Sequence, residues 1–338
     1  MSKDLHIITN ESIYFEDGKF YCDNIDLKSI PESLNEQRNI SVIARKSKKK
    51  RSKKIDIKNI KISSNIFFYL YSIIKSFFKQ QNTYLIISIS PYTFAASVLL
   101  KIFNKKQFVY LRSDGFREYR SILGILGPAI YHFMFLIVSR SSSLISCRKH
   151  ILRGRPGHIV HPSQLNEKWF IKTKQENFDK NKLLYIGRLR VEKGIFSLSK
   201  LIKNTNIKLT VVTSEKENDV NLNSQNISVI NFENYNDAII NFYDKHGIFI
   251  LPSYTEGHPQ VLDEALARCR PVIVFEEISH VVRNRKGVFI AKRKIESLKE
   301  TIDHIIRNYE LIKEDIKKNT LPTKKKFIEE LKTIVFKD

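Results

Sequence analysis

Short apolar runs alternate with amphipathic segments along the chain, and this alternation predicts a parallel α/β fold. In the first half, apolar runs predict strands at Leu5–Thr9, Ile40–Ala44, Ile55–Ile62, Tyr84–Ile89, Phe108–Leu111, Ser143–Ser146 and His158–His161. Apolar residues at helical spacing predict helices at Ile66–Phe78, Tyr92–Phe103 and Ile122–Val138. Glu11–Ser33 shows no clear period and is compatible with a hairpin or a loop. This half therefore has the pattern of a Rossmann-like sheet.

The same alternation resumes after a polar stretch without apolar period, residues 166–181, which is the predicted linker between two domains. Strands are predicted at Lys182–Gly187, Lys208–Thr213, Ile248–Leu251, Val272–Phe275 and Val288–Ile290. Helices are predicted at Lys193–Lys203, Asn236–Tyr243, Ile295–Arg307 and, in the tail, Pro322–Val335. The second half is therefore a second α/β domain.

Two carboxylates accompany the strand-loop-helix-strand unit of Leu251–Phe275. Glu256 lies in the loop that follows the first strand, where ligands bind in parallel sheets. Pro259 suits the first position of the helix, and Glu264 is predicted on the side of that helix opposite its apolar packing face. The two side chains can converge on one ligand, or they can be solvated residues that flank an ordinary helix.

Two cations occupy a second strand-turn-helix unit, Lys182–Gly194. A buried strand runs into a Gly-Arg turn at Gly187 and Arg188, and Lys193 precedes the next helix. Such cations could bind an anionic group together, or each could belong to a basic surface turn.

Together these segments resemble retaining glycosyltransferases of family 4, whose architecture is GT-B. Leu251–Phe275 resembles the family's E-x7-E signature, and Lys182–Gly194 resembles its G-R-L-x-x-x-K-G element. The resemblance implies two Rossmann-like domains that face each other across a cleft: an acceptor domain, residues 1–165, and a donor domain, residues 182–321. It also implies that the C-terminal helix, within residues 322–338, returns to the N-terminal domain.

The resemblance also implies roles for individual residues. Glu256 would approach the transferred hexose, Glu264 would bind the ribose hydroxyls, and Arg188 with Lys193 would hold the diphosphate. Arg188, Lys193 and Glu256 are thus the predicted catalytic residues. The remaining predicted donor-binding residues lie in the turn and at the start of the helix, where backbone N–H groups suit a diphosphate: Gly187, Gly257, His258, Gln260 and Val261.

The chain departs from the family pattern at two places. Glu276 and Glu277 occupy positions where the family carries glycines that touch the donor sugar, so they are candidates for sugar contact or are solvated. In the first domain, Arg112 and Asp114 stand where the family places a histidine near the sugar. They are candidates for acceptor contact, although an Asp-Gly pair is also typical of a turn.

Composition predicts a cytoplasmic protein. Its 338 residues suit two domains, and three scattered cysteines favour a reducing compartment. The N-terminus lacks the apolar core of a signal peptide. The apolar segment Ile122–Val138 is barely long enough to cross a bilayer, and we interpret it as a buried or interfacial helix.

The formal net charge of +23 indicates an anionic partner. Residues 1–170 hold 28 lysines and arginines against 12 aspartates and glutamates, and the remaining residues hold 30 against 23. Arg45–Lys54 is a basic run whose self-repulsion should disfavour regular structure, and the aromatic Ile66–Phe78 follows it. We therefore expect peripheral binding to an anionic membrane, on the inner face of the cell membrane. The alternative is a solvated loop beside core aromatics.

Absent motifs narrow the function. The chain has no Asp-x-Asp pair, which predicts a metal-independent enzyme, and no nicotinamide or P-loop fingerprint, so no cofactor is expected. The hypothesis is a retaining hexosyltransferase that uses a nucleotide-diphosphate sugar and a glycan or lipid-linked acceptor, in surface polysaccharide or lipopolysaccharide synthesis. An epimerase or hydrolase of nucleotide sugars remains an alternative. A basic nucleic-acid-binding protein is a more remote one, because no nucleic-acid module is present, and no nucleic-acid partner is expected.

Overall fold

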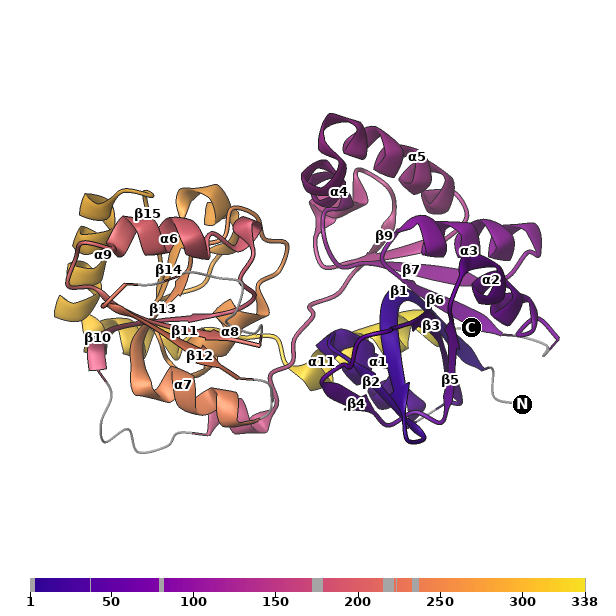
Figure 1. The fold of residues 1–338 in the computed structure, drawn as a ribbon, viewed down its shortest axis with the longest axis horizontal. Helices are drawn as coiled ribbons and strands as arrows, with labels where there is room; N and C mark the ends of the chain where they lie inside the picture. Colours follow the sequence, from indigo (N-terminus) through magenta and orange to yellow (C-terminus); the bar gives the residue numbers. More distant parts are fainter. Residues whose placement is uncertain are drawn as a thin grey trace. The chain divides into compact units, whose positions relative to one another are not determined.

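The chain folds into two compact units (Figure 1). This computed structural model describes residues 4–36, 38–78, 82–171, 179–214, 222, 224–232 and 237–337. The first unit comprises Met1–His161 together with Lys325–Asp338, and the second comprises Pro162–Lys324. The predicted linker, residues 166–181, lies partly outside the described residues, at 172–178. Its Trp169, in the 3₁₀ turn Glu167–Phe170, is buried in the core of the second unit.

The first unit is built on a parallel sheet whose described strands follow the order β5-β3-β1-β6-β7-β8-β9. Their bounds are β1 Leu5–Glu16, β3 Ile40–Lys46, β5 Asn59–Ser63, β6 Thr83–Ile87, β7 Gln107–Leu111, β8 Ser143–Ser146 and β9 Gly157–Ile159. The end of β1 continues as an antiparallel ribbon with β2, Lys19–Cys22, and β2 pairs with β4, Lys53–Ile55. The segment without clear period therefore holds a hairpin, and also helix α1, Ile25–Asn35.

Helices cover both faces of this sheet (Figure 1). One face packs against α1 and the C-terminal helix α11, Lys324–Val335, whose apolar side chains join the core beside β1, β3 and β7. The other face packs against α2, Ile66–Ile74, α3, Pro91–Ile102, and α5, Gly127–Ser139. The return of the C-terminal helix to the N-terminal unit is thus confirmed.

The apolar segment predicted as one helix at Ile122–Val138 is divided. It forms α4, Gly115–Leu123, a 3₁₀ turn, Gly124–Leu126, and then α5. Gly124 breaks the helix with a φ of +65°, which a side chain would disfavour. By composition and length, Gly115–Ser139 could cross a membrane. However, α5 at 13 residues is about 20 Å long, and a bilayer core is about 30 Å thick.

Glycine allows α4 and α5 to pack closely as a helical hairpin. A Cβ on Gly115 would lie 2.1 Å from the Tyr131 ring of α5, and a Cβ on Gly127 would lie 2.0 Å from the Tyr119 carbonyl oxygen of α4. The ring of Tyr131 also packs on Phe116 and Tyr119. The hairpin is therefore held at its open end and at its turn.

The basic run Arg45–Lys54 is more ordered than self-repulsion predicts. Its first two residues end β3 and its last two begin β4. Acidic side chains of neighbouring segments neutralise part of it: Lys50 pairs with Glu16 at 2.9 Å, and Arg51 pairs with Asp23. The prediction of irregular structure is wrong at both ends of the run, because these ion pairs offset the repulsion.

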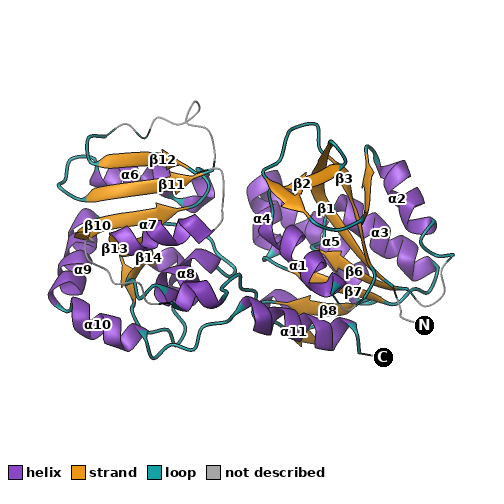
Figure 2. Ribbon diagram, turned by 90° about the horizontal axis from the view of Figure 1, so that it is seen from below, coloured by secondary structure: helices purple, strands orange, loops and turns teal. Residues whose placement is uncertain are grey.

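The second unit contains a wholly parallel sheet. In the described part of the chain its strands follow the order β12-β11-β10-β13-β14-β15, most of which Figure 2 shows edge to edge. Their bounds are β10 Asp179–Ile186, β11 Lys208–Thr213, β12 Ile227–Asn231, β13 His246–Leu251, β14 Val272–Phe275 and β15 Val288–Ala291. After β10 the chain adds β11 and β12 on one side, and it then crosses to the other side to add β13, β14 and β15. The pair of β10 and β13 therefore marks the switch point of a doubly wound sheet.

Helices α6, Ile195–Ile202, and α9, Ile295–Arg307, cover one face of this sheet, and α7, Ile240–Lys245, and α8, Gln260–Ala267, cover the other (Figure 1). The predicted helix Asn236–Tyr243 begins outside the described residues and continues as a 3₁₀ turn, Asp237–Ile239, and α7. An additional helix that the sequence analysis did not predict, α10 Tyr309–Ile316, follows α9.

A buried histidine lies at the start of β13. The Nδ1–H of His246 donates to the Phe242 carbonyl at 2.7 Å, and Nε2 accepts from the Thr210 hydroxyl at 2.8 Å. This arrangement suits the neutral ring, which has one N–H donor and one acceptor nitrogen. Burial lowers the pKa of His246, and the bond to Phe242 offsets only part of that effect.

We predict that truncation of the C-terminal helix core destabilises the first unit. Leu331 is fully buried, so Leu331→Ala should lower the free energy of unfolding by about 2–5 kcal/mol. The matched control is Leu311→Ala on the exposed side of α10, with a change of about 0.5 kcal/mol or less. Chemical denaturation measures both, and hydrogen exchange should show the loss of protection in residues 4–161. Equal effects of the two substitutions would contradict the packing of α11.

We also predict that stability falls on acidification through His246. Its pKa is lower folded than unfolded, so the unfolded state binds more protons and the free energy of unfolding rises with pH across this window. The contribution of His246 to the free energy of unfolding is complete above its unfolded-state pKa of about 6.5, and it is lost as the pH falls below that value. Denaturation midpoints measured between neutral and mildly acidic pH should fall less steeply in His246→Asn than in the wild type. His158→Asn, at an exposed position, is the control. Identical slopes in all three proteins would refute this role.

Candidate donor site

Two loops at the carboxyl ends of neighbouring strands form the candidate site. Gly187–Gly194 follows β10 and Pro252–Pro259 follows β13. Because β10 and β13 pair in parallel at the switch point, both loops lie at the same edge of the sheet. Ligands bind at this position in doubly wound sheets. The two motifs that the sequence analysis singled out are therefore adjacent in space.

The backbones of the two loops are in direct contact. The N–H of Tyr254 donates to the Glu192 carbonyl at 2.9 Å. Gly194 has a φ of +68°, and a Cβ there would lie 1.9 Å from the Pro252 carbonyl oxygen. Only glycine meets both requirements, which explains the glycine at the end of the first motif.

Lys193 and Glu256 form an ion pair across this contact. Lys193 Nζ lies 2.7 Å from Glu256 Oε1, which also accepts from the Ser253 hydroxyl at 2.7 Å. The ring Nε2–H of His280 donates to the Glu256 carbonyl at 2.9 Å. The side chain and backbone of Glu256 are therefore both oriented. The roles of Ser253 and His280 could not be predicted, because local sequence patterns give no sign of these contacts.

Arg188, near the start of the first loop, is exposed to solvent. The backbone below it is fixed, since its carbonyl accepts from the Tyr185 hydroxyl at 2.7 Å and the N–H of Gly187 donates to Val212 at 3.0 Å. No ion pair or side-chain hydrogen bond of the guanidinium occurs within the described residues. Its donors are therefore accessible to an anion.

Glu264 is buried, contrary to its predicted position on an outward side of the helix. Its side chain is 4% exposed, and Oε2 accepts from the Tyr243 hydroxyl of α7 at 2.7 Å. The prediction was wrong because α7 packs beside α8 and covers that side. Pro259 is the N-cap residue and α8 begins at Gln260, which places Gln260 and Val261 in the first turn.

Two buried arginines after α8 fix it to α7. Arg268 makes a bidentate pair with Asp244 at 2.8 and 2.7 Å. Arg270 donates to the carbonyls of Tyr243 at 2.8 Å and Asp244 at 2.9 Å. Because Tyr243 is also the partner of Glu264, these contacts hold the buried carboxylate in place. The sequence pattern gave no sign of these contacts.

His258 and Asp263 form a buried group beneath the second loop. His258 Nε2 lies 3.2 Å from Asp263 Oδ2, and Arg285 lies 2.8 Å from the other carboxylate oxygen. Burial lowers the pKa of His258 and outweighs the opposite effect of Asp263. Burial raises the pKa of Asp263, but His258 and Arg285 reverse this and hold it below its usual range. The His258 side chain therefore supports the loop from within the core.

The two glutamates after β14 differ in their surroundings. Both belong to the 3₁₀ segment Glu276–Val281. Arg293 lies 2.7 Å from Glu277 and also donates to the Pro252 carbonyl at 2.9 Å. Glu277 is therefore tied to the loop contact. Glu276 is exposed and makes no ion pair with any residue in the described ranges, so its carboxylate faces solvent at the same edge of the sheet.

Arg112 and Asp114 belong to the first unit. Asp114 caps α4 by accepting from the Phe116 N–H at 3.1 Å, and it pairs with Arg153 at 3.1 Å. The Arg112 guanidinium lies 3.8 Å from Glu11 and 3.9 Å from Asp26. Asp114 thus has a structural role at the start of α4, in line with the turn that an Asp-Gly pair favours.

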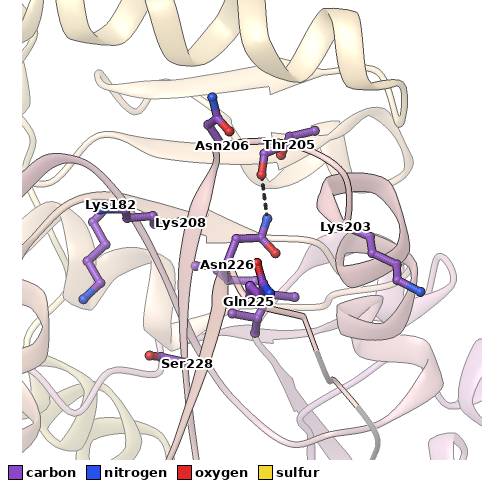
Figure 3. A pocket seen from close by; sticks show the side chains of 10 residues that line it. Lys182, Lys203, Thr205, Asn206, Lys208, Gln225, Asn226 and Ser228 are labelled. Atoms are coloured by element: carbon purple, nitrogen blue, oxygen red, sulfur yellow. Dashed lines mark hydrogen bonds between the residues drawn. The ribbon is translucent and has the colours of Figure 1, made fainter.

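A separate hollow of about 480 Å³ lies at the opposite edge of the second sheet (Figure 3). It is lined by the starts of β10, β11 and β12, including Lys182, Lys208 and Ser228. Asn226 donates to the Thr205 carbonyl there at 3.2 Å. Since it lies at the amino ends of the strands, the hollow is not part of the candidate donor site.

Most of the second unit matches a known protein family. Residues 167–321 match the family described as "Glycosyl transferases group 1". A curated relative, the capsular polysaccharide biosynthesis glycosyltransferase CapM of Staphylococcus aureus, is 34% identical over 149 residues. That alignment covers 40% of this chain and 39% of the relative, so the chain spans well under half the length of this curated protein.

Solved structures resemble the whole chain. Sucrose-phosphate synthase from Thermosynechococcus elongatus has a TM-score of 0.71 at 12% identity, with 98% of each chain covered. HepE of Anabaena in complex with UDP has a TM-score of 0.67 at 10% identity, with 99% of this chain and 95% of that chain covered. At such identities the likeness establishes the fold. The chain therefore has the GT-B fold, and its residues 167–321 are similar to the glycosyl transferases group 1 family.

Proposed function

We propose that this protein transfers a hexosyl group from a nucleotide-diphosphate sugar to a glycan or lipid-linked acceptor, with retention of configuration. The observation that carries the proposal is the ion pair of Lys193 and Glu256 at the switch point of the second sheet. It joins the loop that holds Arg188 to the loop that leads into α8, the helix that holds Glu264. The relationship to a capsular polysaccharide glycosyltransferase supports a role in surface polysaccharide synthesis.

The cations suit the diphosphate of the donor. The accessible guanidinium of Arg188 offers paired donors to phosphate oxygens, and Lys193 supplies a point charge. Before a donor binds, Glu256 neutralises Lys193 at 2.7 Å. This ion pair holds Lys193 at the junction of the two loops, so little reorganisation is needed when phosphate oxygens arrive. Backbone N–H groups in the first turn of α8 add further donors.

The carboxylates suit hydroxyl groups. A carboxylate can accept from two neighbouring hydroxyls at once, as the ribose of a nucleotide presents them. Glu264 has this capacity and is fixed by Tyr243 at 2.7 Å. Glu256, oriented by Ser253 and Lys193, would accept from hydroxyls of the hexose. The exposed Glu276 is a further candidate for contact with the donor sugar.

Retention would follow from transfer on one face of the sugar. The bond between the anomeric carbon and the phosphate oxygen breaks, and a bond from the same carbon to the acceptor oxygen forms on the same face. The acceptor hydroxyl proton passes to the departing phosphate oxygen. In this scheme the residues position the substrates, while Arg188 and Lys193 stabilise the charge on the leaving diphosphate.

Substitutions in the two motifs should separate turnover from binding. Arg188→Ala should lower kcat about 10²-fold, because its charge partner grows in the transition state. Glu264→Ala should weaken binding of UDP, a probe suited to this site, about ten-fold or more, because hydroxyl partners are lost. Calorimetry measures binding, and release of UDP from a panel of UDP-sugars measures turnover.

Two matched variants test the specificity of these effects. Arg307→Ala removes an exposed guanidinium from α9, away from the loops, and should leave both parameters unchanged. Tyr243→Phe keeps the Glu264 carboxylate but removes its donor, and should weaken UDP binding less than Glu264→Ala does. Wild-type affinity and activity in both Arg188→Ala and Glu264→Ala would exclude the donor-site assignment. Turnover that needs no acceptor would favour an epimerase or a hydrolase.

Metal independence is a separate prediction. Because Arg188 and Lys193 can balance the diphosphate charge, transfer should persist at an unchanged rate after treatment with EDTA. The measurement is initial rate in chelator, compared with rates after addition of Mg²⁺ or Mn²⁺. A rate that collapses in chelator and returns with either ion would show that a metal neutralises the diphosphate.

A further inference from the structure

One helical layer of the first unit carries most of that unit's exposed large apolar side chains. The layer consists of α2 and the turn after it, the end of α3, and the α4–α5 hairpin. Its exposed members are Phe67, Phe68, Tyr71, Ile74, Phe78, Ile102, Phe103, Ile122, Leu123, Ile125, Leu126, Ile130 and Phe133. Outside the layer, the described part of the first unit adds only Phe15 and Ile159. We call this surface the apolar layer.

Aromatic contacts join neighbouring helices of the apolar layer. The rings of Phe77, after α2, and Phe103, after α3, are 4.9 Å apart, and Phe94 of α3 and Phe133 of α5 are 6.0 Å apart. Figure 1 shows α2, α3 and α5 over the same face of the sheet. A soluble surface rarely exposes contiguous apolar area on this scale without a binding role.

The tip of the hairpin is the most exposed part. Every residue from Arg120 to Leu126 is exposed, and Ile125 and Leu126 are 89% and 71% exposed. Gly127 packs against the Tyr119 carbonyl directly behind this tip. The turn therefore projects four large aliphatic side chains from a rigid base.

The segment of the chain that contains the apolar layer is strongly basic. Residues 57–166, which include the whole layer, contain 15 lysines and arginines but only two acidic residues, Asp114 and Glu118. Asp114 is already engaged as the α4 cap and by Arg153. An apolar surface in a cationic setting complements a bilayer with anionic headgroups, which attract cations while acyl chains accept the apolar side chains.

We propose that the apolar layer binds an anionic lipid bilayer, with the Ile122–Leu126 tip inserted below the headgroups. A second copy of the chain fits this surface less well, because a two-fold contact would place one cationic, acid-poor face against another. The basic run Arg45–Lys54 is a weaker anchor than its sequence suggests, since Lys50, Arg51 and Lys54 are paired with acidic side chains. This inference depends on the surface alone and not on the proposed transferase activity.

Vesicle co-sedimentation tests the proposal on the full chain. The probes are vesicles of phosphatidylcholine alone and with an increasing share of phosphatidylglycerol, at low and at high salt. Wild-type binding should rise with phosphatidylglycerol and fall with salt. The double variant Ile125→Ser, Leu126→Ser should bind the vesicles at least about ten-fold more weakly. The reason is that it lacks two aliphatic side chains that enter the acyl region in the wild type.

The matched control is Leu311→Ser, an exposed leucine of the second unit with 72% exposure, which should bind vesicles like the wild type. Phe67→Ser, at a residue 80% exposed on α2, is a second test within the layer and should also weaken binding. Analytical ultracentrifugation without lipid accompanies the assay. Wild-type protein that stays in the supernatant with anionic vesicles, or a tip variant that binds normally, would overturn the proposal. A lipid-independent dimer that the tip variant abolishes would assign the layer to self-association instead.

Discussion

The contact between Gly194 and the Pro252 carbonyl determines where the candidate donor residues lie. A Cβ at position 194 would come within 1.9 Å of that oxygen, so any other residue would force the two loops apart. Lys193 and Glu256 flank this contact and meet at 2.7 Å. Arg293 reinforces it by donating to the same carbonyl at 2.9 Å. The geometry of the charged side chains is therefore set by a backbone approach that only glycine permits.

Much of the fold could be predicted from the sequence because the sheets are parallel. Buried parallel strands are short apolar runs, and the helices between them carry apolar stripes, so both periods are visible. The order of the strands could not be predicted, since nothing local states that β10 lies between β11 and β13. The motifs identified Lys193 and Glu256, but their direct contact depends on that order.

The sequence was least informative where a segment is apolar on several sides or where a residue's partner lies on another element. For Ile66–Phe78 the pattern gives no inward face, and the structure buries Tyr69 and Ile73 while leaving other aromatics exposed. Glu264 was predicted on the side of its helix opposite the apolar packing face, yet Tyr243 from another helix provides it with a buried partner. The arginines that hold α7, Arg268 and Arg270, bind backbone and side-chain groups more than twenty residues away. Sequence patterns do not report such distant partners.

The return of the last helix to the first unit affects the order in which the chain can fold during synthesis. Residues 162–324 are contiguous, so the second unit can form once they have left the ribosome. The first unit lacks Phe327, Ile328 and Leu331 of its core until α11 has been made. The N-terminal half must therefore wait with an open apolar face while the whole second unit is translated. Its native packing requires a helix that is made after the second unit, and a chain that stops before α11 would leave that face uncovered.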